Sequence, residues 1–128
     1  MQRVTRTIAV VGTGDMGSAV GGALVRAGYR VVTAGHGRSA HSLALAAQEG
    51  IEDVGTLDSV VQCADLLLSI LPPAAAATFA AEATAVMIKN GRRPLFADCN
   101  AVAPATVAAI AQVVAPAGAP FVDVGIVG

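Results

Sequence analysis

Residues 7–17 read TIAVVGTGDMG, an apolar and β-branched run that ends in glycines spaced G-x-G-x-x-G. The run predicts a short buried strand, and the glycines predict a sharp turn into a helix. Gly12 permits the exit from the strand, Gly14 leaves room for a diphosphate, and Gly17 lets the helix pack closely on the sheet. The free N–H groups and positive dipole end of such a helix attract phosphate. The spacing therefore predicts a turn that binds a dinucleotide.

The residues that follow support this interpretation. A helix is predicted over residues 16–27, because apolar residues recur there at helical spacing: Met16, Val20, Leu24 and Ala27. Gly28 ends that helix, and residues 30–34 form the next strand. The alternative is a glycine-rich turn without a ligand, but strand, turn, helix and strand in this order favour a nucleotide site.

The rest of the chain repeats the alternation of strand and helix. Near-continuous apolar runs, such as LLLSIL at 66–71, are typical of a parallel sheet that is covered on both faces. The sequence therefore predicts an α/β protein with a Rossmann-type doubly wound parallel sheet, helices on both faces and strand order 3-2-1-4-5-6. The predicted strands are 7–12, 30–34, 52–54, 66–71, 94–98 and 121–124, and the predicted helices are 16–27, 39–49, 57–63, 74–89 and 104–114.

Composition excludes several classes of function. The chain has 128 residues, of which 55% are hydrophobic and 13% charged, which is too apolar for a disordered protein. No apolar run approaches the ~20 residues that a membrane span needs, and a net charge of −1 without a basic stripe argues against a nucleic-acid partner. Cys63 and Cys99 are too few for a metal framework. We expect both to be buried thiols of a cytoplasmic protein that holds no metal.

The loop after the second strand bears on the choice of cofactor. Residues 33–39 read TAGHGRS and contain no acidic residue; Gly35 stands where an NAD-binding domain has the carboxylate that holds the ribose. Arg38 can form a fork to phosphate oxygens, His36 can add a donor, and Ser39 can cap the next helix and donate as well. These residues favour NADP over NAD. The alternative is a solvated polar loop in which Arg38 faces water.

Further contacts are predicted at the carboxyl ends of the fourth and fifth strands, where ligands bind in such sheets. Asn100 could bond to ribose, nicotinamide or substrate, or it could form a turn. Asp15 is expected to point outward and help the first helix to start. The predicted cofactor-binding residues are Gly12, Thr13, Gly14, Asp15, Met16, Gly17, His36, Arg38, Ser39, Leu71, Pro72 and Asn100.

Four segments in order resemble one family, the β-hydroxyacid dehydrogenases, which include 3-hydroxyisobutyrate and 6-phosphogluconate dehydrogenases. Residues 11–19, VGTGDMGSA, resemble the opening of that family, and residues 68–72, LSILP, are similar to its "xxLP" segment. Residues 98–104, DCNAVAP, resemble its "D-x-S-T-x-x-P", and residues 121–128, FVDVGIVG, its "D-A-P-V-S-G-G". The first motif is shared by many Rossmann enzymes, whereas the order of all four is much more specific. The resemblance covers nearly the whole chain.

The resemblance implies an NADP(H)-binding domain over residues 1–128 at the front of a larger oxidoreductase, with hydride transfer to or from a small hydroxyacid-like substrate. A helical C-terminal domain would complete the site, form a homodimer and supply a catalytic Lys. The chain holds one lysine, Lys89, which ends a predicted peripheral helix and which we interpret as structural. The catalytic residue is therefore not identified in this chain.

The sequence also departs from the family pattern. Asn100-Ala101 replaces the family's Ser-Thr pair, and Val127 replaces the Ser of the substrate loop. Substrate contacts would come from Asn100, Gly125 and Val127. Two enzyme alternatives remain open, an imine reductase and a deazaflavin-dependent NADP reductase, which has a similar Gly-Thr-Gly-Asp turn. A stand-alone nucleotide-sensing module is the alternative outside the enzymes.

Overall fold

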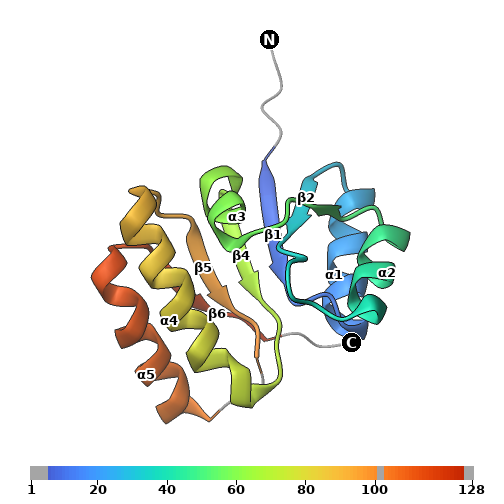
Figure 1. Ribbon diagram of the computed structural model, residues 1–128. Helices are drawn as coiled ribbons and strands as arrows, with labels where there is room; N and C mark the ends of the chain where they lie inside the picture. The colour runs from blue at the N-terminus through green and yellow to red at the C-terminus, as the bar shows by residue number, and fades with distance from the viewer. Residues whose placement is uncertain (1–5, 101–102, 126–128) are drawn as a thin grey trace.

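A six-stranded parallel sheet forms the centre of the computed structural model, which describes residues 6–100 and 103–125 (Figure 1). The strand order β3-β2-β1-β4-β5-β6 confirms the doubly wound topology predicted from the sequence. The strands are β1 (Thr7–Val11), β2 (Arg30–Thr33), β3 (Glu52–Asp53), β4 (Leu66–Ser69), β5 (Leu95–Asp98) and β6 (Phe121–Asp123). The helices are α1 (Asp15–Arg26), α2 (Ala40–Gln48), α3 (Leu57–Cys63), α4 (Pro73–Asn90) and α5 (Pro104–Val114), with a 3₁₀ turn η1 (Ala115–Ala117).

The central strand β1 defines where the chain changes direction. It pairs with β2 on one side and with β4 on the other, so that Ile8 lies opposite both Val31 and Leu66. The first crossover carries the chain from β1 to β2, and a later one carries it back past β1 to β4. Because the loops after β1 and β4 leave the sheet in opposite directions, a crevice opens between them at the carboxyl edge.

Two hydrophobic layers hold the sheet between its helices. Helices α1 and α2 cover one face, and α3, α4 and α5 cover the other (Figure 1). The larger layer centres on Phe96, whose ring stacks on Phe79 at 6.0 Å and on Phe121 at 5.9 Å between ring centroids. The smaller layer contains Val10 and Val31. Burial of each such large side chain contributes about 1.5–3 kcal/mol.

Helix α1 packs on the sheet through glycine. The apolar repeat predicted the helix, but Met16 in that repeat is 53% exposed, and the buried positions are Gly17, Ser18, Gly21 and Gly22. A Cβ at Gly21 would overlap the side chain of Ile51. Small residues on this face therefore bring the helix axis close to β1, and they bring its N-terminus close to the turn that precedes it.

The structure also corrects details of the predicted elements. The strand predicted over 66–71 ends at Ser69, because the main chain then leaves the sheet toward Pro72, and the Leu71 N–H bonds to the Asn100 side chain instead. The 3₁₀ turn after α5 was not predicted. Cys99 is buried as expected, but Cys63 is only partly buried.

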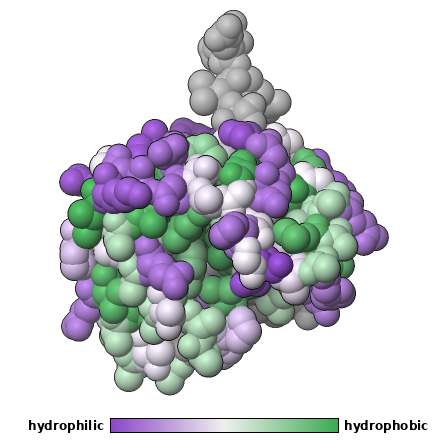
Figure 2. Space-filling model, viewed as in Figure 1, coloured by the Kyte–Doolittle hydropathy of each residue, from purple (hydrophilic) through white to green (hydrophobic). Residues whose placement is uncertain are grey.

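Much of the hydrophobic composition is alanine on the outside of helices. Figure 2 shows pale green, weakly hydrophobic surface over the lower part of the molecule, where α4 and α5 begin. Exposed alanines on α4 include Ala74, Ala77, Ala81 and Ala85. In the described part of the chain, no helix combines the length and the hydropathy that a membrane span requires.

Candidate functional site

The turn between β1 and α1 leaves the start of α1 open. Gly14 is the N-cap residue of α1, and no side chain accepts a hydrogen bond there. By contrast, Ser39 caps α2 and Thr56 caps α3 through their hydroxyl oxygens. The first N–H groups of an uncapped helix are left for water or an anion. The start of α1 thus has the donors that a diphosphate needs.

Two glycines of the turn, Gly14 and Gly17, have different surroundings. A Cβ at Gly17 would overlap the carbonyl oxygen of Gly12, so the protein itself requires glycine there. A Cβ at Gly14 would meet no atom within 4 Å. Folding therefore leaves position 14 free to carry a side chain, and the space beside it is a cradle that a Cβ would partly fill. The residues present fit a dinucleotide diphosphate.

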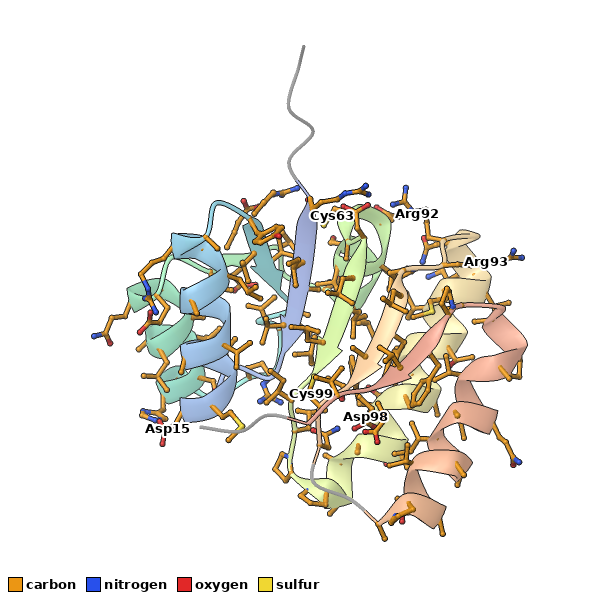
Figure 3. The ribbon with its side chains drawn as sticks, turned by 180° about the vertical axis from the view of Figure 1, so that it is seen from behind. Asp15, Cys63, Arg92, Arg93, Asp98 and Cys99 are labelled. Atoms are coloured by element: carbon orange, nitrogen blue, oxygen red, sulfur yellow. The ribbon has the colours of Figure 1, made fainter. Side chains whose placement is uncertain are left out.

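Buried hydroxyls fix this turn against its surroundings. Thr13 Oγ1 donates to the Ser42 carbonyl oxygen on α2 at 3.0 Å, and Ser18 Oγ donates to the Thr13 carbonyl oxygen at 2.9 Å. The Thr13 hydroxyl is thereby used within the protein, and its main chain is what remains for a ligand. The Asp15 carboxylate points to solvent, as expected, with its Oδ1 3.7 Å from Nε2 of His41 (Figure 3).

A cleft of about 430 Å³ opens at the carboxyl edge of the sheet beside this turn. Its volume falls within the usual range for small-molecule sites. It brings together residues that are far apart in sequence, from the starts of α1 and α4 and from the segments that follow β1, β4, β5 and β6. The lining residues are Gly14, Met16, Gly17, Ile70, Leu71, Pro72, Pro73, Cys99, Asn100, Val124 and Gly125. Seven of the predicted site residues are in this set, whereas Val127 lies outside the described residues.

Asn100 joins the ends of two neighbouring strands at the cleft. Its Oδ1 accepts from the Leu71 N–H at 2.6 Å, and its Nδ2 donates to Ser69 Oγ at 3.1 Å. Its own main-chain N–H donates to Asp98 Oδ1 at 2.9 Å. The side chain therefore holds β4 and β5 in register at their carboxyl ends, while it also lines the cleft. Asn100 therefore has a structural role, whether or not it also contacts a ligand.

Asp98 is fully buried behind this network, and its Oδ2 has no hydrogen-bond partner. Burial raises the pKa of the Asp98 carboxyl above its ordinary value, with a smaller contribution from the charge of Asp123 on the next strand. Burial also raises the pKa of the Cys99 thiol to about 11, and the charges of Asp98 and Asp123 add to that shift. Cys99 is therefore an unreactive thiol at neutral pH.

The three polar residues after β2 that were predicted to bind the cofactor, His36, Arg38 and Ser39, differ in their surroundings. The Arg38 guanidinium lies over the turn, since a Cβ at Gly12 would overlap its Nη2 atom. Ser39 caps α2 as predicted, because its Oγ accepts from the Ser42 N–H at 3.1 Å. The His36 side chain is exposed, and its main-chain N–H donates to the Gly55 carbonyl oxygen at 2.9 Å. Of the three, Arg38 is the one whose side chain lies at the turn between β1 and α1.

Sequence reasoning missed Asp53, which ends β3. Its Oδ1 accepts from the N–H groups of Gly35 and Gly55, both at 2.8 Å. A Cβ at Gly35 would overlap this carboxylate, so Gly35 is required by Asp53. The structure pairs Thr33 with Asp53 and so places the two strand ends side by side, a register that the sequence alone did not reveal.

Lys89 lies at the end of α4, away from the cleft. Its Nζ is 3.3 Å from Asp58 Oδ1, which agrees with the structural interpretation. Among the described residues that line the cleft, Cys99 is the one with a titratable side chain. The described residues that line the cleft thus bring no acid or base of ordinary pKa into it.

The fold and its glycine turn define a Rossmann-type nucleotide-binding domain. Residues 7–128 match the family described as the NAD binding domain of 6-phosphogluconate dehydrogenase, and the chain belongs to that family. No curated protein matches the chain in sequence.

Solved structures show the same fold. The conserved protein MTH1747, whose structure is similar to 3-hydroxyacid dehydrogenases, shares 24% identity at a TM-score of 0.83 over 95% of this chain and 44% of its own. Mycobacterium tuberculosis 3-hydroxyisobutyrate dehydrogenase shares 21% at 0.79 over 98% of this chain and 42% of its own. The imine reductase of Myxococcus stipitatus in complex with NADP+ shares 21% at 0.76 over 98% and 42%. The chain thus spans less than half the length of each.

Replacing Gly14 with Ala separates a ligand role from a folding role. We expect Gly14→Ala to keep the thermal midpoint of the wild type, because the added methyl meets no protein atom. We expect the same change to weaken binding of NAD(P) by about tenfold or more, since the methyl enters the diphosphate cradle. Gly17→Ala is the control, and it should lower the thermal midpoint because its methyl overlaps Gly12. Undiminished binding by a folded Gly14→Ala protein would contradict the assignment of the cradle.

Asp98 should make stability depend on pH. Because its pKa is raised in the folded protein, the stability that its protonated form contributes is present below the unfolded pKa of about 4 and is lost as pH rises through the folded value. Asp98→Asn should therefore gain free energy of unfolding relative to wild type as the pH rises above about 4, measured by urea titration. Asp58→Asn is the control with the opposite slope, since hydrogen bonds from Asn90 and Lys89 lower the pKa of Asp58. Parallel curves for wild type and Asp98→Asn would contradict this account.

Proposed function

We propose that the chain is the NADP(H)-binding part of an oxidoreductase that acts on a small hydroxyacid-like substrate. The observation that carries the proposal is the uncapped start of α1, with an empty position beside Gly14 and a cleft directly next to it. When bound, the nicotinamide cofactor would supply hydride transfer. The residues of this chain would bind the cofactor, orient it and shield one side of it.

The contacts follow from the arrangement of the cleft. The N–H groups at the start of α1 would hold the diphosphate, with the helix dipole adding to the attraction. Leu71, Pro72 and Asn100 would line the half of the cofactor that extends toward β4 and β5. Met16 would cover it from the α1 side, because its side chain is exposed at the rim of the cleft.

A preference for NADP is supported by the position of Arg38. Its guanidinium lies at the phosphate turn and carries the donor geometry that phosphate oxygens need. The loop after β2 offers no carboxylate of its own, and the nearby Asp53 already accepts two main-chain N–H groups through one oxygen. Imine reductase structures of this fold are known with NADP+ and, for a variant, with NAD+. Both cofactors are therefore compared in the test below.

The proton that accompanies hydride transfer needs a donor that the described cleft does not contain. We place that acid or base in a further region of the full-length protein, which would also complete the substrate site around Asn100, Gly125 and Val127. In keeping with the family resemblance, the full-length protein would be a cytoplasmic homodimer.

Imine reduction is a second candidate, and the observation that favours it is Asn100. Where the resembling dehydrogenases have hydroxyls, this chain presents an amide whose Oδ1 and Nδ2 already bond to Leu71 and Ser69. Assays of the full-length protein with hydroxyacids and NADP+, and with cyclic imines and NADPH, would distinguish the two. Turnover of the imines alone would favour the second candidate.

Removing the Arg38 side chain tests the cofactor preference. We expect Arg38→Ala to raise the dissociation constant of NADP+ by about tenfold, because a charge-assisted hydrogen bond to the 2′-phosphate is lost. The dissociation constant of NAD+ should change by less than about twofold, because NAD+ lacks that phosphate. Titration calorimetry with both nucleotides measures the two values.

Arg26→Ala is the matched control, since Arg26 is an exposed arginine at the other end of α1 that pairs with Glu49. It should leave both constants unchanged. An equal loss for NAD+ and NADP+ in Arg38→Ala would mean that Arg38 contacts the shared diphosphate, and the proposed preference would then fail.

A further inference from the structure

The pair Asn90-Gly91 stands where α4 ends, and neither residue is among those that line the cleft. Asn90 is the last residue of the helix, and Gly91 caps it with a φ of 66°, in the left-handed region that favours glycine. The pair also has a chemistry of its own. Because glycine has no side chain, its main-chain nitrogen can approach the amide carbon of a preceding asparagine with little steric hindrance.

The reaction that this approach permits is an intramolecular acyl transfer. The Gly91 nitrogen gives up its proton and forms a bond to Cγ of Asn90, the bond from Cγ to Nδ2 breaks, and Nδ2 leaves as ammonia after it takes a proton from water. Water then hydrolyses the cyclic succinimide at either of its two carbonyl carbons. The products are aspartate or isoaspartate at position 90, and water is the only co-reactant.

In the folded protein, the end of α4 holds both reacting groups in other hydrogen bonds. The Gly91 N–H donates to the Met87 carbonyl oxygen. Nδ2 of Asn90 donates to the Val86 carbonyl oxygen, one helical turn back, at 2.8 Å. The side-chain amide is therefore directed back along the helix, and the nitrogen that would attack it is already bonded.

Helix α3 restrains the same amide from the other side. Asp58 and Gln62 lie four residues apart and thus on one face of α3, and we call these two residues the α3 clamp. Oδ1 of Asp58 accepts from Nδ2 of Asn90 at 3.1 Å, and Nε2 of Gln62 donates to Oδ1 of Asn90 at 3.1 Å. Hydrogen bonds from Asn90 and Lys89 hold the pKa of Asp58 below its ordinary value, so this acceptor is ionised at neutral pH.

We propose that Asn90 is a site of spontaneous deamidation and that the α3 clamp sets its rate. The reaction requires the end of α4 to open, so its rate is the fraction of open chains multiplied by the rate in the open chain. The product cannot restore the contact, because a carboxylate at position 90 only accepts hydrogen bonds and repels Asp58. Deamidation therefore releases α3 from the end of α4, and this inference does not depend on cofactor binding.

The test measures how fast Asn90 converts in the full-length protein at neutral pH, below its thermal midpoint. Mass spectrometry of peptides gives the converted fraction over time, and isoaspartate among the products identifies the succinimide route. We expect Asp58→Ala to raise the rate about tenfold and Gln62→Ala about threefold, because a hydrogen bond to an ionised acceptor is the stronger of the two. Lys89→Ala is the matched control and should keep the wild-type rate, since it removes the ion pair to Asp58 and no hydrogen bond of Asn90.

Wild-type protein unfolded in urea supplies the rate of the open chain, and Asn100 in the same samples reports opening elsewhere in the domain. A folded wild type that converts as fast as the unfolded chain overturns the inference, as does an unfolded chain in which Asn90 does not convert. Equal rates in the wild type and in both clamp variants also overturn it. The same holds if Asn100 accelerates as much as Asn90, because the variants would then act through global unfolding. If Asp58→Ala fails to fold, Gln62→Ala decides the outcome.

Discussion

The close approach of α1 to the end of β1 is the constraint on which the site depends. Gly17 faces the carbonyl oxygen of Gly12 at a separation that no side chain tolerates, and a Cβ at Gly21 would force the end of the Ile51 side chain to move. This contact fixes where the open N-terminus of α1 lies relative to the sheet. The cleft and the position of Arg38 are both defined from that point. The glycines of the sequence motif thus set how closely α1 packs against the end of β1.

The opposite wall of the cleft is held by side-chain hydrogen bonds. Asn100 bridges the ends of β4 and β5. Asp98, at the end of β5, is buried with one unpartnered oxygen (Figure 3). Buried polar groups stabilise a structure only when they are hydrogen-bonded, so the orphaned oxygen costs free energy at neutral pH. The Asn100 network offsets part of that cost and keeps the strand ends rigid. Where the resembling dehydrogenases have hydroxyls, this chain has a residue already committed to holding its own sheet.

The sequence was informative wherever local chemistry decides the structure. The alternation of elements and the continuous apolar strands predicted the sheet and its order, and Ser39 was correctly predicted as a cap. Contacts between distant segments were not readable in the same way. The buried face of α1 is its glycine side, which no hydrophobic repeat reveals, because glycine carries no side chain to count. The Asp53 carboxylate gained significance only from strand register, which a single sequence does not encode locally.

The central claim is that main-chain amides at the start of α1 hold the diphosphate of a nicotinamide cofactor. Amide proton–nitrogen NMR correlation spectra, recorded while the full-length protein is titrated with NADP+, test it most directly. The account predicts saturable shifts that are largest at residues 13–18, with smaller shifts around Arg38 and Leu71. Saturable shifts confined to other parts of the sheet, or no shifts at cofactor excess, would contradict it.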